Sequence, residues 1–337
     1  MSAYQAALIH LLSVLVVDAA AAQRVELRAA PPVVFPGVSD SNSPVFWWNG
    51  AFTVIQSAAL PIFSRGPELL GQLKARAVAL DTYEHTPLWI ESVWLDDDGT
   101  LYAWYHHESM VCDGKLSVPV VGALVSDNGG ESFRDLGIVL APAEAPDCEA
   151  ANGYFAGGHG DFTVLLDEQR QYFYFYFGNY GGPESSQGIA VARLAFQDRA
   201  EPAGKVWKFF NGAWEEPGLG GRVTAILPAR VPWSRPDADS FWGPSLHWNS
   251  AINRYVMLLS RACCEPGWPA EGVYISFNQD IGNPYGWSPP EKILDRGEAR
   301  WYPQVIGLEA GASDRLAGGV ARLFLGGDSH WEIVFHP

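Results

Sequence analysis

The sequence predicts an all-β protein built from repeated hairpins. Three observations lead to this class. Glycine (35 residues) and proline (24) divide a chain of 337 residues into short segments without helical periodicity. Apolar residues make up 48% and aromatic residues 13% of the chain, enough for a sizeable core. After residue 40, an aromatic strand, a tight turn and a second aromatic strand recur along the sequence.

The recurring unit is a β-hairpin. Asn49-Gly50 and Asp98-Gly99 are dipeptides typical of two-residue hairpin turns, which need positive φ. Five units in about 300 residues leave about 60 residues each, room for a four-stranded propeller blade. No linker rich in Gly, Ser or Pro divides the chain. We therefore predict a single-domain, five-bladed β-propeller over residues 23–337, with hairpins at residues 44–55, 89–105, 161–177, 245–259 and 302–325.

The first 22 residues have the pattern of a secretory signal peptide. An apolar run from Ala6 to Val17 precedes small residues suited to cleavage before Gln23. A buried N-terminal helix is the alternative. No other segment approaches the ~18 apolar residues of a membrane span. The pattern predicts a secreted or periplasmic protein without a membrane partner.

Four cysteines suit an exported protein. Cys112 and Cys148 are the pair we expect to bridge neighbouring strand groups, although four cysteines permit three pairings. The adjacent Cys263 and Cys264 would form a vicinal disulfide or send one sulfur elsewhere. Their spacing matches no zinc site, and no metal ligand set is predicted.

The charge narrows the class of ligand. Lys and Arg number 22 and Asp and Glu 38, giving a net charge of −16, which disfavours nucleic acids and anionic membranes as partners. Neutral or cationic ligands are easier to accommodate. The sequence contains no P-loop, dinucleotide fingerprint, Gly-x-Ser-x-Gly or His-Glu-x-x-His motif.

Acidic residues at the starts of inner-strand candidates, together with the five aromatic hairpins, give the chain a resemblance to a known group. It resembles the five-bladed β-propeller glycoside hydrolases, which include arabinanases, furanosidases and fructosidases. The resemblance implies a glycosidase that acts on a poly- or oligosaccharide and requires no cofactor, with acids converging at one end of the central channel. Together with the export pattern, it predicts a secreted enzyme. A structural calcium ion in that channel is compatible with it.

Three carboxylates on different blades are the predicted catalytic groups. Asp40, in Ser39-Asp-Ser-Asn-Ser-Pro44, resembles the family's base or nucleophile, and Asp161 the residue that orients the acid. Glu91 lies between apolar neighbours in a strand, where an unpaired charge is costly, so it faces a polar channel or is paired. We expect Glu91 to act as the acid. The structural alternatives are turn capping by Asp40 and Asp161.

The predicted fourth blade departs from the family. Arabinanase-like enzymes commonly place the acid Glu directly before a small residue and Pro, whereas this chain has Trp242-Gly243-Pro244. Asp239 and Glu108 therefore compete with Glu91 for the role of acid. The residues predicted to contact substrate are Asn42, Ser43, His85, His107, Glu108, His159, Asn179, Asp239, Trp242 and His247.

Two other functions remain open from the sequence. The missing fourth-blade Glu favours a propeller that binds glycan without cutting it. Ser126-Asp-Asn-Gly-Gly-Glu-Ser-Phe133 resembles the Asp-box turn of sialidase propellers, which suggests a six-bladed sialidase-like enzyme. The acidic net charge opposes the anionic substrate of that last class.

Overall fold

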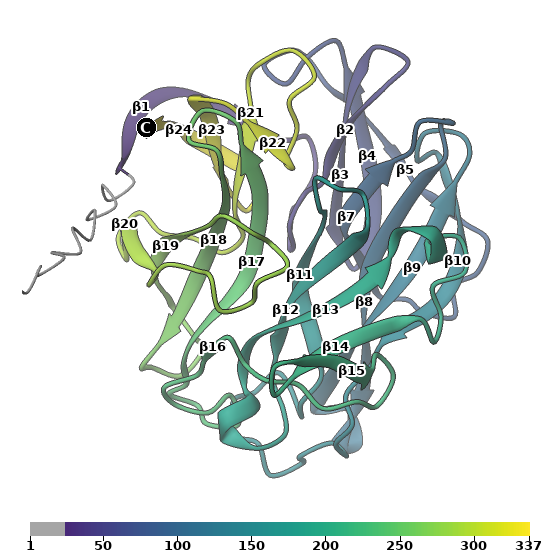
Figure 1. Cartoon of the computed structure of the whole chain (residues 1–337), viewed down its shortest axis with the longest axis vertical. Coiled ribbons are helices and arrows are strands. Elements are labelled where there is room, and N and C mark those ends of the chain that lie inside the picture. The colour runs from purple at the N-terminus through teal and green to yellow at the C-terminus, as the bar shows by residue number, and fades with distance from the viewer. Residues whose placement is uncertain (1–23) are drawn as a thin grey trace, which may run out of the picture.

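Five sheets lie in chain order around a common centre in the computed structural model, which describes residues 24–337 (Figure 1). The five-bladed β-propeller predicted from the sequence is confirmed, and the six-bladed alternative is wrong because the described chain forms five sheets. The predicted signal peptide at residues 1–22 lies outside the described residues.

The first three blades contain the following strands, innermost first. Blade one has β2 (Val45–Trp48), β3 (Ala51–Ala58), β4 (Leu60–Gly66) and β5 (Lys74–Ala77). Blade two has β7 (Leu88–Leu95), β8 (Leu101–Val111), β9 (Leu116–Ser126) and β10 (Ser132–Leu140), with β6 (Ala79–Leu80) parallel beside β10. Blade three has β11 (His159–Leu166), β12 (Tyr172–Asn179), β13 (Gly188–Ala195), β14 (Val206–Phe210) and β15 (Ala213–Pro217), with β16 (Leu227–Pro228) beside β13.

Two more blades complete the ring. Blade four has β17 (Asp239–Asn249), β18 (Arg254–Cys263), β19 (Ala270–Asn278) and β20 (Glu291–Asp295), with β22 (Leu316–Ala317) parallel beside β17. Blade five has β21 (Pro303–Gly307), β23 (Val320–Leu325), β24 (Asp328–His336) and β1 (Arg24–Val34). Short 3₁₀ turns are η1 (Cys112–Gly114), η2 (Glu184–Ser186) and η3 (Phe196–Asp198).

The two ends of the described chain close the ring. Strand β1 pairs antiparallel with β24, from Arg24 opposite His336 to Val34 opposite Asp328. The N-terminal strand is therefore the outermost strand of the last blade (Figure 1).

Each predicted hairpin forms the two inner strands of one blade. Residues Asn49 and Gly50 both have positive φ (49° and 76°), as the turn dipeptide predicted. The Asp-box segment also folds as a capped turn, between β9 and β10. There the Ser126 hydroxyl accepts the Gly130 N–H at 3.0 Å, and the Asn128 side chain accepts the Ser132 N–H at 3.0 Å.

Apolar side chains fill the spaces between neighbouring blades. Strand β12 shows the principle, because successive side chains point to opposite faces of a sheet. Phe173, Phe175 and Phe177 pack toward blade two, whereas Tyr174 and Tyr176 pack toward blade four. A sixth cluster lies apart from these interfaces, and it includes Tyr180, Trp233, Trp242 and Trp268.

Both cysteine pairs form disulfides. Cys112–Cys148 joins η1 to the long loop between β10 and β11, as predicted. Cys263–Cys264 is a vicinal disulfide at the end of β18. Each disulfide is followed within a few residues by cavity-lining residues: Lys115 after Cys112, Gly153 after Cys148 and Gly267 after Cys264.

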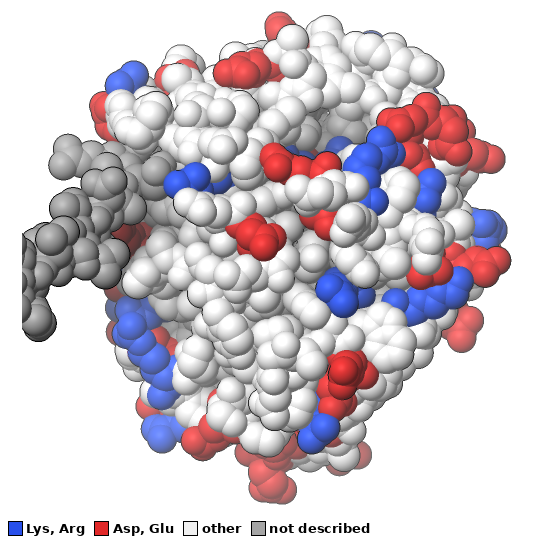
Figure 2. Space-filling view, viewed as in Figure 1, with Lys and Arg blue, Asp and Glu red and all other residues white. Residues whose placement is uncertain are grey.

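Acidic and basic side chains are interspersed on the face shown in Figure 2, so the excess of acidic groups forms no single-sign region there. Among residues 24–337, no helix is long and apolar enough to cross a membrane.

Candidate active site

A cavity of about 400 Å³ opens where the five inner strands begin. Asp40 precedes β2, Trp89 and Asp161 lie near the starts of β7 and β11, Trp242 lies in β17, and Tyr302 precedes β21. The cavity is therefore at one end of the propeller channel. The other residues that line it are His106, Glu108, Met110, Lys115, Ser117, Gly153, Tyr154, Phe155, Gly267, Trp268 and Trp301.

Bulges interrupt three inner strands at this level. Glu91 falls between paired residues Ile90 and Ser92, and Asp161 falls between Gly160 and Phe162, so neither has a partner in its ladder. The ladder of β17 is interrupted after Trp242. A bulge re-aims the side chain of its extra residue and is over-represented beside functional sites.

The backbone at Asp161 is in the left-handed region, with φ of 43°. Such a conformation is uncommon outside glycine and costs free energy that the surrounding structure must supply. The glycines before it allow close packing against protein. A Cβ on Gly158 would lie 2.6 Å from Pro119, so at this position the missing side chain makes room for β9.

Glu91 and His106 form a buried ion pair behind the cavity. Glu91 is 1% exposed, its Oε1 contacts His106 Nδ1, and its Oε2 accepts the Phe162 N–H at 3.2 Å. Trp89 stacks on the imidazole with ring centroids 4.6 Å apart. Burial alone would lower the pKa of His106, but Glu91 and Glu108 outweigh it and raise the pKa to about 10. Burial also raises the pKa of Glu91, so the contact between Glu91 and His106 holds a proton at neutral pH. His106 lines the cavity, whereas Glu91 does not.

The surroundings shift the pKa values of two carboxyl groups in the cavity in opposite directions. Burial, followed by the charge of Glu91, raises the pKa of Asp161 to about 7. The Tyr180 hydroxyl donates a hydrogen bond to its Oδ2. Burial alone would raise the pKa of Glu108, but the hydrogen bond and the charge of His106 lower it below its ordinary value. The Glu108 carboxylate lies 3.7 Å from His106 Nε2 and accepts the Ser117 hydroxyl at 2.8 Å.

Asp40 is the third carboxyl group of the cavity. The residue is exposed, and partial desolvation raises the pKa of its carboxyl group. Near neutral pH the cavity thus combines one carboxyl group poised to hold a proton with one kept ionised.

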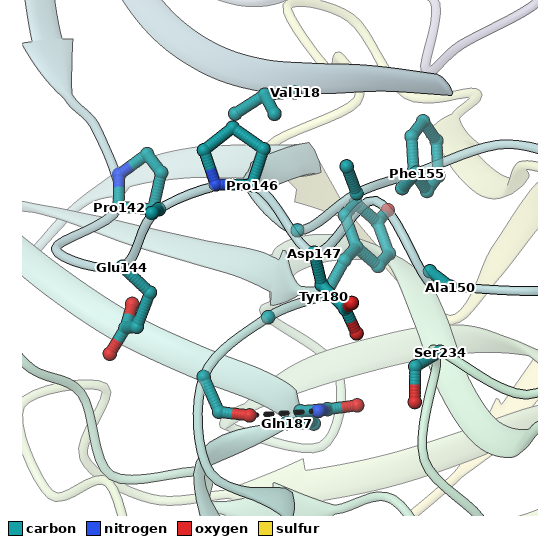
Figure 3. A pocket seen from close by; sticks show the side chains of 16 residues that line it. Val118, Pro142, Glu144, Pro146, Asp147, Ala150, Phe155, Tyr180, Gln187 and Ser234 are labelled. Carbon is teal, nitrogen blue, oxygen red and sulfur yellow. Dashed lines mark hydrogen bonds between the residues drawn. The ribbon is translucent and has the colours of Figure 1, made fainter. Parts of the chain in front are cut away.

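A second, smaller cavity of about 200 Å³ is lined by Phe155, Tyr180 and Gln187, among others (Figure 3). Phe155 and Tyr180 stack with ring centroids 4.4 Å apart, and both line this cavity, while Phe155 also lines the larger one. Gln187 on its floor donates to the Gly182 carbonyl at 3.0 Å, drawn as a dashed line in Figure 3. The Phe155–Tyr180 pair is therefore a shared wall that supports Asp161.

The structure brings Asp40, Asp161, Glu108 and Trp242 together in the cavity and places Glu91 immediately behind it. The other predicted substrate contacts do not line the cavity. The Asn42 amide donates to the carbonyls of Phe162 and Pro244, both at 3.0 Å, and so ties blades together. Ser43 is buried, and its N–H donates to Gln304.

The predicted histidines lie elsewhere in the fold. His85 contacts Asp135 at 2.6 Å, and His107 donates from Nδ1 to the Pro87 carbonyl at 2.9 Å. His159 and His247 are fully buried, and burial holds the pKa of each well below its usual range. Both are neutral core residues.

Two further predicted contacts serve the backbone and an ion pair. The Asn179 amide donates to the carbonyls of Gly181 and Ser186. Asp239 accepts two hydrogen bonds from Arg261, at 2.8 and 2.9 Å.

Sequence reasoning passed over His106 and chose its neighbour His107. The available signal was strand alternation: residues two apart share a face, so His106 faces the same way as Glu108 and His107 faces away. Trp268 and Trp301, which also line the cavity, come from loops that no local pattern connects to it.

One group could hold a cation. Glu91, His106 and Asp161 each offer a ligand atom, all within 4.8 Å of one another. The direct contact between Glu91 and His106 occupies one ligand atom of each. The other such group, Asp239 with Cys263 and Cys264, offers disulfide sulfurs, which are poor ligands compared with thiolates.

The sequence matches no protein-family model and no curated protein. Solved structures share the fold. An α-L-arabinanase from Cellvibrio cellulosa aligns with a TM-score of 0.52 at 11% identity, covering 88% of this chain and 91% of that one. An exo-1,5-α-L-arabinanase from a bovine ruminal metagenomic library gives 0.50 at 13% identity, covering 88% and 94%.

A third structure, an exo-β-1,3-galactanase from Phanerochaete chrysosporium with β-1,3-galactotriose, aligns with a TM-score of 0.52 at 14% identity. The alignment covers 91% of this chain and 64% of that one. At these identities the similarity establishes the five-bladed propeller fold of arabinanases and galactanases, as the sequence resemblance predicted.

Proposed function

We propose that the chain is a glycoside hydrolase whose catalytic cavity lies at the starts of the inner strands. One observation carries the proposal: Asp161 and Glu108 face one cavity, and their surroundings shift the two pKa values apart. Glycosidic cleavage needs a protonated acid at the leaving oxygen and an ionised carboxylate opposite it. Carboxyl groups with pKa values pushed apart are the pattern that supplies both. Aromatic walls that stack on sugar C–H groups are consistent with a carbohydrate substrate.

The geometry favours roles that differ from the sequence-based assignment. Because Glu91 does not line the cavity, we assign the acid to Asp161, whose pKa of about 7 keeps much of it protonated at neutral pH. Glu108 is the base or nucleophile in this proposal, because its lowered pKa keeps it ionised. Asp40 then binds substrate hydroxyls, and Glu91 acts through His106 as a positioning residue.

Substrates with a poor and with a good leaving group test whether Asp161 is the general acid. The Asp161→Asn variant should lose about 10²- to 10⁴-fold in kcat/KM on a polysaccharide with a poor leaving group, and much less on an activated aryl glycoside that needs no protonation. The Glu108→Gln variant should lose activity on both. Glu149→Gln, at an exposed position outside the cavity, is the matched control and should leave both rates unchanged. Equal losses in Asp161→Asn on both substrates would contradict the assignment of the acid.

A glycan-binding protein without hydrolase activity is the second candidate. Trp242 favours this candidate. It stands directly before Gly243-Pro244, where the glycoside hydrolases that the chain resembles commonly have their acid, and it lines the cavity. Binding to polysaccharides without turnover on a broad substrate panel would support this candidate and reject the hydrolase.

We further propose export of the mature chain from Gln23. The two disulfides of the described chain are consistent with an oxidising compartment. N-terminal sequencing of the exported protein tests the cleavage site. The proposed chemistry requires no cofactor, and we propose neither nucleic acid nor membrane as a partner. A calcium ion bound in the channel would contribute to stability and not to catalysis. Activity that survives a chelator would agree with this proposal.

A further inference from the structure

A second groove lies on the outer part of blade three, far from the cavity. Its volume is about 380 Å³, and its lining comes from Tyr172 at the start of β12, Arg193 in β13, Trp207 in β14 and Trp214 in β15. Tyr172 and Tyr180 are separated by eight residues of nearly continuous strand, about 26 Å at the usual rise. Tyr180 contacts Asp161, so the groove is at the opposite end of the blade from the cavity.

Arg193 is fixed in the groove and has no ion-pair partner in the described part of the chain. Its guanidinium carbon lies 4.3 Å from the centroid of Tyr172 and 4.8 Å from that of Trp214. Two aromatic rings therefore fix the guanidinium group in place, which limits the entropy lost when its N–H groups bind a ligand. Among residues 24–337, no carboxylate lies within ion-pair distance of Arg193.

Neighbouring basic residues, unlike Arg193, have ion-pair partners. Arg170 and Arg199 also stack on an aromatic ring, that of Phe196, but both pair with Asp96. Lys205 and Asp198 also line the groove, and they pair with each other at 3.3 Å. The uncompensated charge is thus specific to the arginine that two rings hold in the groove.

Trp207 supplies an exposed aromatic surface beside this arginine. Arg193 and Trp207 are direct cross-strand partners, and the tryptophan is 43% exposed. Glu215, an exposed carboxylate, also lines the groove. The groove therefore offers an aromatic surface for sugar C–H groups, donors for hydroxyl or carboxylate oxygens, and an acceptor for hydroxyl hydrogens.

We propose that this groove is a second carbohydrate-binding site, which holds a segment of polysaccharide while the cavity stays free. A strip of aromatic surface with a fixed donor and a nearby acceptor has the chemistry of a glycan site. Its distance from the cavity separates it from any sugar bound there. Such a site would raise the effective concentration of polymer at the cavity. The binding does not depend on the proposed hydrolase activity.

Affinity electrophoresis through gels containing linear arabinan, β-1,3-galactan or polygalacturonate tests the site. The wild-type protein should be retarded by at least one of them, and Trp207→Ala should bind that polymer about tenfold more weakly. Arg193→Lys, which keeps the charge but loses the planar stacked group, should weaken binding comparably. Retardation by the two neutral polymers would show hydroxyl recognition, and retardation by polygalacturonate alone would show carboxylate recognition.

The matched control is Tyr83→Ala, since Tyr83 is 61% exposed and does not line the groove. It should migrate as the wild type does. Turnover of a small aryl glycoside should be unchanged in Trp207→Ala if the cavity is catalytic. The proposal is overturned if none of the three polymers retards the wild type, or if Trp207→Ala is retarded as strongly as the wild type or no more weakly than Tyr83→Ala.

Discussion

Replacing Asp161 by Asn should stabilise the protein at high pH even though it removes a group that we place in catalysis. The pKa of this carboxyl group rises from 3.8 to about 7 on folding, because folding buries it beside Glu91. Below pH 3.8 the group is neutral in both states and the substitution changes little. As the pH rises toward 7, the unfolded state ionises first, so the free energy of unfolding falls. A shift of about 3 pKa units at 1.36 kcal/mol each gives about 4 kcal/mol above pH 7.

The assay is urea unfolding followed by tryptophan fluorescence at pH 4 and at pH 8. An amide is neutral at both values and can still accept the Tyr180 hydroxyl, so Asp161→Asn should gain up to about 4 kcal/mol over the wild type at pH 8 and only about 0.6 kcal/mol at pH 4. Asp127→Asn, at an exposed position in a turn, should show no such pH dependence. A variant that is equally destabilised at both pH values would refute the reasoning, because burial would then not oppose ionisation of Asp161.

Two further predictions follow from the same structure. For the hydrolase, kcat/KM should fall above about pH 7, because Asp161 then loses its proton. The acidic limb of the pH profile should lie below the ordinary pKa of a glutamate, because the pKa of Glu108 is lowered. A pH-rate series tests both limbs, and activity that increases steadily from pH 7 to 9 would contradict the assignment. Replacing Cys112 and Cys148 by Ala removes a bond that spans 36 residues and should cost about 4 kcal/mol of unfolding free energy. Because the loop after Cys148 carries Tyr154 and Phe155 into the cavity, KM should also rise in this variant. Urea denaturation and steady-state kinetics measure the two effects. A loss of unfolding free energy below about 1 kcal/mol, or an unchanged KM, would contradict this prediction.

Local sequence patterns were sufficient to predict the blades. Turn dipeptides such as Asn49-Gly50 require positive φ, and alternating aromatic residues such as those of β12 fit a sheet packed on both faces. These constraints act within one hairpin, so they can be read without knowing what the hairpin packs against. The same logic located Asp40, Asp161 and Trp242, since residues near the starts of inner strands meet at one end of a propeller. Glu108 reaches the same end because β8 runs antiparallel to the inner strand β7.

Strand alternation fails where a strand bulges, and the candidate site is built on bulges. An extra residue at Glu91 or Asp161 shifts the ladder by one position, so period-two reasoning cannot say which side chain enters the cavity. Polar residues that stabilise backbone, such as Asn42 and Asn179, have the same side-chain chemistry as sugar-binding residues, and only their hydrogen-bond partners distinguish the two.

The sequence by itself thus determined the all-β class and the five hairpins, because each depends on residues near one another in the chain. It left three cysteine pairings open, and the structure forms the expected pair, Cys112–Cys148. The tertiary structure decided which acids act together. The pKa of Asp161 depends on burial and on Glu91, and that of Glu108 depends on His106 and Ser117. These shifts arise from desolvation and from charges a few ångströms away, which exist only after separate blades have closed into a ring.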